Sequence, residues 1–249
     1  MVFYVVYRAS KDYKNRSLIP RRLRAIGCTQ LGKSFWEIEE EKADRAFWLL
    51  QKNQPIFLKR IREIRKPRFL KEKDIYEPGS MVIVAYRTPK EAKRERIRNF
   101  LKRAPCIRLC RSVYAFYQEH SRFDKNNELV DARRFRNFIQ EIEEDVKVVP
   151  RVVIVNSESV ERLLEETRER IEDEISDIVE CCKDLYQKAS EGKYDEQHIR
   201  NVLSKINRRF ITVKKVATFY ERWLKMDFSK SLMKPYGAIQ KLHSIIDLE

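Results

Sequence analysis

The sequence has little glycine, cysteine and histidine, and it lacks long apolar runs. Its 249 residues include five glycines, five cysteines and three histidines. The longest apolar runs are far shorter than the roughly 20 residues that a membrane-spanning helix needs. The chain also begins without the basic segment and apolar stretch of a signal peptide. We therefore expect a cytoplasmic protein without a membrane segment.

The cysteines and histidines do not form a metal-binding pattern. The five cysteines include no Cys-x-x-Cys pair, and the three histidines are scattered singly. We expect reduced, buried cysteines, although Cys106 and Cys110 lie close enough in the sequence to pair. A Gly-rich phosphate loop and a Ser, His and Asp pattern are also missing. The sequence therefore predicts no cofactor, no metal site and no nucleophilic catalytic site.

Positive charge is concentrated in the first two thirds of the chain. The whole sequence has 53 Lys and Arg against 38 Asp and Glu, a net charge of +15. Residues 1–80 hold 19 against 10, residues 81–160 hold 17 against 11, and residues 161–249 hold 17 against 17. A basic region beside a neutral one indicates a polyanionic partner. Abundant Lys, Arg and Glu with little glycine are also typical of a thermophile.

Two segments of the chain repeat the same pattern. Met1–Arg8 reads MVFYVVYR and Met81–Arg87 reads MVIVAYR, so each is a strand-like run that ends in Tyr-Arg. The motif Arg-x-x-Lys-[Asp/Glu]-x-Lys follows at an offset of 79 residues, and strand-like segments around Trp36 and Tyr114 follow at an offset of 78. For these two aromatic residues we expect core packing, with base stacking as the alternative. The repeat predicts two copies of one module.

Each copy continues with a basic helix, two strands, a second helix around residues 41–52 or 131–144, and a final strand. This is the βαββαβ order of the ferredoxin-like fold. The second copy closes with a strand over residues 146–155, whereas residues 55–66 fit a strand or a helix equally well. The sequence therefore predicts an α+β fold with two tandem ferredoxin-like modules, residues 1–78 and 79–156, and a C-terminal antiparallel helical region, residues 157–249.

The C-terminal region has the periodicity of amphipathic helices. Apolar residues recur every three to four positions over residues 157–188 in an acid-rich background. Gly192 supplies a stop, and Asp195 is a plausible N-cap for a second, basic helix. We expect the acidic and basic helices to pair antiparallel. A short final helix is expected after Pro235.

One known family has a similar arrangement. The run from a strand ending in Tyr, through a basic helix, to Lys-Ser-Phe-Trp at 33–36 or Arg-Ser-Val-Tyr at 111–114 resembles the small CRISPR-associated endoribonuclease family of the spacer-acquisition complex. The resemblance implies a ferredoxin-like fold and an intramolecular version of the family's dimer. In that family the first strand typically ends Tyr-Asp, and the Asp helps to hold a divalent metal. Arg8 and Arg87 occupy the equivalent positions here, where a fixed cation repels a metal ion.

Arginines at strand ends are the sharpest candidates for binding residues. Loops at such ends commonly hold ligands, and the guanidinium groups of Arg8 and Arg87 suit phosphate. The alternative is an ion pair with Asp12 or Glu91. The basic helices add cations that we interpret as contacts for a phosphate backbone, with a solvated helix face as the alternative. The candidate nucleic-acid-binding residues are Arg8, Lys11, Lys14, Arg16, Arg21, Arg22, Arg24, Arg87, Lys90, Lys93, Arg94, Arg98, Lys102 and Arg103.

Three functions are compatible with these features. The leading hypothesis is a non-catalytic nucleic-acid-binding protein whose two modules contact the phosphate backbone, with double-stranded DNA favoured over RNA. Residues 157–249 then bind a protein partner or form a homodimer. The second hypothesis is a metal-dependent nuclease with Asp12 and Glu91 as metal ligands. The third is a regulator or interaction protein that acts through its C-terminal helices.

Overall fold

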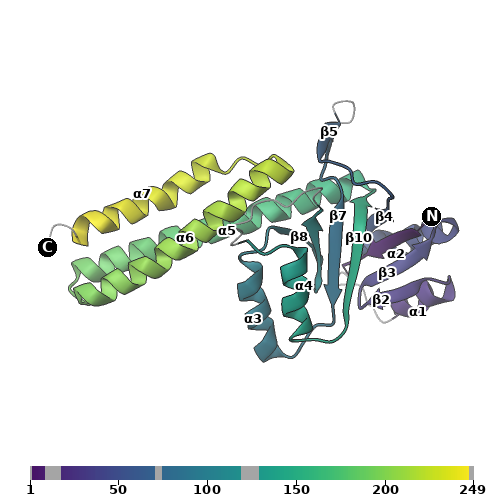
Figure 1. The fold of residues 1–249 in the computed structure, drawn as a ribbon, viewed down its shortest axis with the longest axis horizontal. Coiled ribbons are helices and arrows are strands. Elements are labelled where there is room, and N and C mark those ends of the chain that lie inside the picture. The colour runs from purple at the N-terminus through teal and green to yellow at the C-terminus, as the bar shows by residue number, and fades with distance from the viewer. Residues whose placement is uncertain (1, 9–17, 71–74, 119–128, 247–249) are drawn as a thin grey trace. The chain divides into compact units, whose positions relative to one another are not determined.

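The computed structural model describes residues 2–8, 18–70, 75–118 and 129–246 of the chain. Over these residues the fold is α+β, with a large antiparallel sheet, a two-stranded hairpin, seven α-helices and a C-terminal helical region (Figure 1). The chain divides into two compact units, residues 1–165 and 166–249. No helix in the described part is both long enough and apolar enough to cross a membrane.

The first half of the first unit packs two helices on one face of four strands. Val5 and Tyr7 alternate along the first strand and meet Ile19 and Leu23 of the first helix in a buried core. Residues 55–66, which local periodicity left open, form a strand over 56–60, because this segment hydrogen-bonds to strands on both sides. The elements are β1 (Val2–Val6), α1 (Leu18–Ala25), β2 (Thr29–Gly32), β3 (Phe35–Glu39), α2 (Ala43–Leu50) and β4 (Ile56–Arg60).

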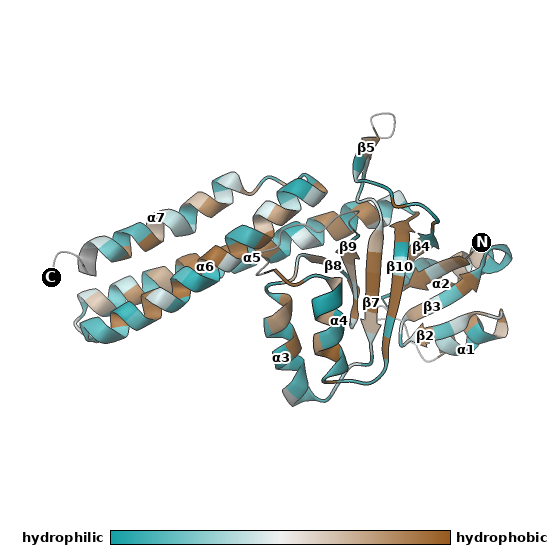
Figure 2. Ribbon diagram, in the orientation of Figure 1, coloured by the Kyte–Doolittle hydropathy of each residue, from teal (hydrophilic) through white to brown (hydrophobic). Residues whose placement is uncertain are grey.

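The second half of the unit has the same order of elements. Val84 of its first strand packs against Phe135 and Ile139 of its second helix. Trp36 and Tyr114 lie in the cores of their respective halves, which confirms that these two aromatic rings are core residues. Strands β7 to β9 are largely hydrophobic, whereas the helices have a hydrophilic side (Figure 2). The elements are β7 (Met81–Tyr86), α3 (Glu91–Leu101), β8 (Cys106–Cys110), β9 (Val113–Tyr117), α4 (Ala132–Gln140) and β10 (Val146–Ile154).

A single strand, β10, joins the two halves into one sheet. The strand order is β2-β3-β1-β4-β10-β7-β9-β8. β10 pairs with β7 from Val146 to Val149 and with β4 from Val152 to Ile154. The register shifts between these segments, at Pro150 and at Arg151, which has a φ of 58°. Proline has no N–H to donate, so it fits a strand interior only at such a bulge.

The sheet folds back on itself, so that its two halves face each other. The guanidinium of Arg8, just after β1, donates to main-chain carbonyls at the end of β8. Four strands separate β1 from β8 in the sheet order, and a flat sheet would place them about 24 Å apart. The faces turned away from the helices are also buried, as at Val6 in β1 and Ile83 in β7. The inner faces of the two halves therefore form a further core.

A short hairpin, β5 (Arg68–Leu70) and β6 (Ile75–Glu77), connects the two halves. The chain then turns at Gly79, which has a φ of +76°. A Cβ atom at this position would lie 2.7 Å from the carbonyl oxygen of Arg65, so the close approach requires glycine. Ser80 donates its N–H to that same oxygen and accepts the Arg65 N–H on its hydroxyl. The start of β7 is therefore held in place by one main-chain hydrogen bond and one bond to the Ser80 side chain.

The second unit consists of helices. Asp195 caps α6 by accepting the N–H of His198 at 2.6 Å, as the sequence predicts. Arg209 on α6 bonds to both Glu174 and Asp177 on α5, and Arg170 donates to the hydroxyl of Tyr220. The contact later in α5 is made by the residue earlier in α6, so these two helices run antiparallel. The elements are α5 (Ser157–Ser190), which begins in the first unit, α6 (Glu196–Leu224) and α7 (Ser229–Ile246).

The prediction that the last helix begins after Pro235 is wrong. The helix begins at Ser229, and Pro235 lies buried within it. Proline removes one main-chain donor from a helix, but it does not prevent a helix that tertiary packing stabilises. Phe228 and Ile239, on either side of the proline, are both buried.

The cysteines differ in accessibility, which yields a direct test of the structure. Cys28, Cys106, Cys110 and Cys182 are buried, as expected, whereas Cys181 is exposed, contrary to expectation. Burial raises the pKa of Cys110 to about 12 and that of Cys182 to about 11, which suppresses their thiolate forms at neutral pH. We expect one thiol per chain to react with Ellman's reagent in the native protein and five in denaturant. Cys181→Ser should abolish the native reaction. Rapid labelling of a second native thiol would contradict the packing.

Candidate nucleic-acid interface

The two repeat-related arginines have different environments. Arg8 is half-buried, and its Nε and one Nη each donate at 2.8 Å, to the carbonyl oxygens of Leu109 and Arg108. The structure thus gives Arg8 main-chain partners in the opposite half of the sheet. Arg87 follows β7 in the same way but is exposed. The repeat therefore does not impose one role on both positions.

A cysteine lies beside the Arg8 contact. Burial raises the pKa of Cys110, while the nearby guanidinium groups of Arg8 and Arg108 act in the opposite direction. Burial prevails, so the thiol is neutral at physiological pH. Arg8 and Arg108 therefore lie beside a cysteine that is not activated as a nucleophile.

The helices of the two halves expose their cations on opposite sides of the first unit. α1 packs with one half and α3 and α4 with the other, and α1 lies across the strands from α3 and α4 (Figure 1). Arg21, Arg22 and Arg24 of α1 are exposed. The Arg24 guanidinium donates to Gln30 at 2.5 Å and lies over the Trp36 ring. The cations of α1 and α3 therefore form separate surfaces.

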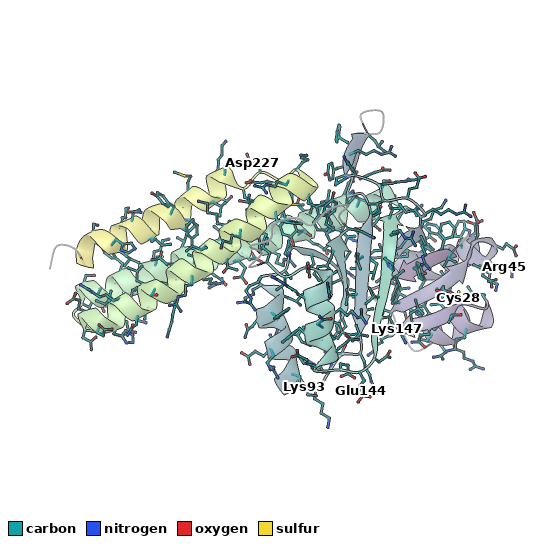
Figure 3. The ribbon with its side chains drawn as sticks, in the orientation of Figure 1. Cys28, Arg45, Lys93, Glu144, Lys147 and Asp227 are labelled. Carbon is teal, nitrogen blue, oxygen red and sulfur yellow. The ribbon has the colours of Figure 1, made fainter. Side chains whose placement is uncertain are left out.

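Charge is unevenly distributed along the α3–α4 layer. Lys93 lies at the N-terminal end of α3, donates to the Ile142 carbonyl and has acidic residues such as Glu144 nearby (Figure 3). Two other candidate binding residues lie at this end of α3. Lys90 is its N-cap, and Arg94 is half-buried and donates to the Pro89 carbonyl. Basic side chains gather along the rest of the layer, from the middle of α3 to its end and over the first half of α4. We call them the α3–α4 basic cluster: Arg96, Arg98, Lys102, Arg103, Arg133, Arg134 and Arg136, all exposed.

Two arginines of this cluster are held on a stack of aromatic rings. Phe100 of α3 and Phe138 of α4 stack in parallel, with ring centroids 3.9 Å apart. The guanidinium of Arg103 lies 5.3 Å from the Phe100 centroid, and that of Arg96 lies 6.0 Å from the Phe138 centroid. Cation–π contacts of this kind restrict the guanidinium groups before any ligand arrives. The stack thus preorganises two cations on the surface.

The arginines of α4 oppose the dipole of their own helix. A helix N-terminus carries partial positive charge, which favours acidic side chains there and basic ones at the C-terminus. α4 has Arg133 and Arg134 in its first turn, no acidic residue in that turn and no basic residue in its last turn. Its cap, Asp131, accepts the N–H of Arg134 and supplies the expected negative charge just before the helix. Arg134 also donates to the Leu129 carbonyl just before the helix, but the positive charges of Arg133 and Arg134 are unfavourable to the dipole of α4.

α1 and α3 differ from α4, because both have basic residues in the last turn, where the dipole favours them, and α3 has Glu91 beside Lys93 and Arg94 in its first turn. α1 has Arg22 and Arg24 in its last turn, and α3 has Arg98 in its last turn with Lys102 as its C-cap. These side chains stabilise their helices whether or not a ligand binds. Their positions are consequently weaker indicators of function than those of α4.

Some predicted residues lie outside the described part of the chain, namely Lys11, Asp12, Lys14 and Arg16. Glu91, the other acid of the nuclease hypothesis, is exposed at the first position of α3. Within the described ranges, no group of three or more His, Cys, Asp and Glu side chains could hold a metal ion.

Sequence reasoning missed several members of the basic cluster. Arg133, Arg134 and Arg136 were visible as a basic run, but the repeat directed attention to the first helix of each copy. Their reversed placement relative to the helix dipole was the available signal. Comparison with known proteins adds no assignment, because no family model, curated protein or solved structure matches this chain.

Proposed function

We propose that this protein binds nucleic acid without catalysis and contacts the phosphate backbone through its first unit. Residues 1–165 carry 37 Lys and Arg against 23 Asp and Glu, which accounts for nearly all of the net charge of +15. The observation that carries the proposal is the group of arginines at the N-terminus of α4. They lie where they disfavour the helix and favour a polyanion.

We further propose that each half of this unit is a ferredoxin-like module. Each half has the order strand, helix, two strands, helix and strand, with its first strand between its third and fourth. The exposed strand-end arginine Arg87 supports a binding version of the module, similar in fold to the CRISPR-associated family and without an acidic residue at either strand end. The preferred ligand is double-stranded DNA, whose regular phosphates match a surface of fixed cations. The helices of residues 166–249 serve a protein partner or a second copy.

The dependence of affinity on salt tests the proposal. We expect a 30-base-pair DNA duplex to bind at about 50 mM salt and its affinity to fall steeply as salt increases. The slope of log affinity against log salt should be near −4 to −6, since each neutralised phosphate contributes about −0.9. Fluorescence anisotropy with a labelled duplex gives both quantities. Absence of binding at 50 mM salt, or a slope near zero, would exclude a phosphate-contacting surface.

A further inference from the structure

An exposed tryptophan on α2 has no role in the fold. α2 buries Ala46 and Leu50 and leaves Phe47 and Trp48 exposed, at 40% and 70% of their surfaces. The other two tryptophans, Trp36 and Trp223, are almost completely buried. Trp48 is the most exposed of the large hydrophobic side chains in the described part of the chain, so its ring is available to a ligand.

The Trp48 ring is supported from one side by other aromatic rings. Phe47 meets Trp48 edge-on, with centroids 6.1 Å apart and an interplanar angle of 80°. Phe47 in turn packs against Phe57 of β4, at a centroid distance of 5.8 Å. The indole is thus attached to the sheet through two rings, and such preorganisation lowers the entropy cost of binding.

The side chains around Trp48 carry positive charge. Arg45 precedes it by three positions on α2, a spacing that places it next to the indole, and Lys52 follows in the 3-10 turn Gln51–Asn53 that directly continues α2. Both are exposed, and Arg45 lies on the outer side of the first half (Figure 3). Asp44 is the acidic neighbour one turn before the ring. α1, which packs with α2 on the same core, adds three exposed arginines, Arg21, Arg22 and Arg24.

We infer that Trp48 stacks on an unpaired base of single-stranded nucleic acid, while Arg45 and Lys52 contact the adjoining phosphates. An aromatic platform between cations suits this ligand, because each base offers a π-face and each nucleotide a negative charge. Bases inside a duplex already stack on one another, so a duplex cannot occupy the ring in this way. The inference rests on the proposed function and adds to it a second surface with a different ligand.

Tryptophan fluorescence tests the inference in the full-length protein. A 12-residue oligothymidylate should quench the emission of Trp48 and protect it from acrylamide, a neutral quencher. The buried Trp36 and Trp223 provide an internal reference for acrylamide. An abasic oligomer with the same phosphates should bind without quenching the emission. Equal quenching by the abasic oligomer would overturn the inference, since charge alone would then suffice.

Variants separate stacking from charge. Trp48→Ala should weaken oligothymidylate binding about tenfold and leave duplex affinity unchanged. Phe69→Ala, at an aromatic side chain of β5 with 52% exposure, is the matched control and should change neither affinity. Asp44→Asn should tighten binding about twofold by removing a like charge from the phosphates. Thermal melts of the variants check that each one is folded.

The outcomes distinguish this inference from the proposed function. If no nucleic acid binds at 50 mM salt, both fail together. If oligothymidylate binds in a salt-dependent manner while Trp48→Ala changes neither emission quenching nor affinity, the stacking site alone is wrong. Conversion of a dimer to a monomer by Trp48→Ala, with unchanged affinity for oligothymidylate, would assign the patch to contact with a second copy instead.

Discussion

Replacing Arg133, Arg134 and Arg136 together by glutamine is expected to weaken duplex binding about a hundredfold near 0.1 M salt. The slope of log affinity against log salt should become shallower by about two to three, because three phosphate contacts are lost and each contributes about 0.9. Anisotropy titrations at several salt concentrations measure both changes. The three side chains are exposed, so the substitutions leave the core of α4 intact.

The same variant should not lose stability. Its thermal midpoint is expected to stay within about two degrees, because removal of two charges that oppose the dipole of α4 offsets the loss of the exposed hydrogen bond from Arg134 to the Leu129 carbonyl. This combination of lost binding and retained stability is the mark of residues kept for function. A solvated helix face without a ligand would give the same stability and no change in affinity, which would exclude α4 from the interface.

Replacement of Arg21, Arg22 and Arg24 by glutamine is the matched control. It removes the same charge from the same unit, but from α1, where two of the arginines lie in the last turn and favour the dipole. We expect a smaller loss of duplex affinity and a lower thermal midpoint. If the α1 variant abolished duplex binding while the α4 variant bound normally, the interface would lie on the opposite side of the first unit.

Local sequence patterns predicted the elements that local forces determine. β1 and β7 follow from β-branched and aromatic runs, and Asp195 marks the start of α6 because capping involves only neighbouring residues. The partners of β10 could not be predicted in this way. Its position between β7 and β4 depends on pairing with β4, about 90 residues earlier in the chain, which leaves no trace in local periodicity.

The candidate site shows the same division. The amphipathic pattern of the basic helices predicts which of their side chains are exposed, and it also predicts that Ile97 of α3 is buried. The sequence could not distinguish Trp36 from Trp48, since both lie in amphipathic segments and only tertiary packing covers the first. It also could not distinguish Arg8 from Arg87. Both end a strand in Tyr-Arg, and only the folded sheet brings the β8 carbonyls to one of them.

Arg8→Ala is expected to lower the free energy of unfolding by about 2 kcal/mol, whereas Arg87→Ala should leave it unchanged. Arg8 donates two hydrogen bonds to β8, and its loss leaves the carbonyl oxygens of Arg108 and Leu109 without these charged donors. Hydrogen bonds from charged groups contribute about 1.5–3 kcal/mol, and partial exposure reduces that value here. Denaturant titration followed by circular dichroism measures both variants.

Arg8→Asp replaces the cation at the end of β1 by an anion and should destabilise the protein more than Arg8→Ala does. A carboxylate at this position would face two carbonyl oxygens. Carboxylate and carbonyl oxygens are all hydrogen-bond acceptors, so the carboxylate would remain unpaired in a half-buried site. Arg8 therefore acts as a link between the two halves of the folded sheet. Unchanged stability of Arg8→Ala combined with a large loss of duplex affinity would contradict this role. That result would make Arg8 a phosphate ligand, as its position at the strand end suggested.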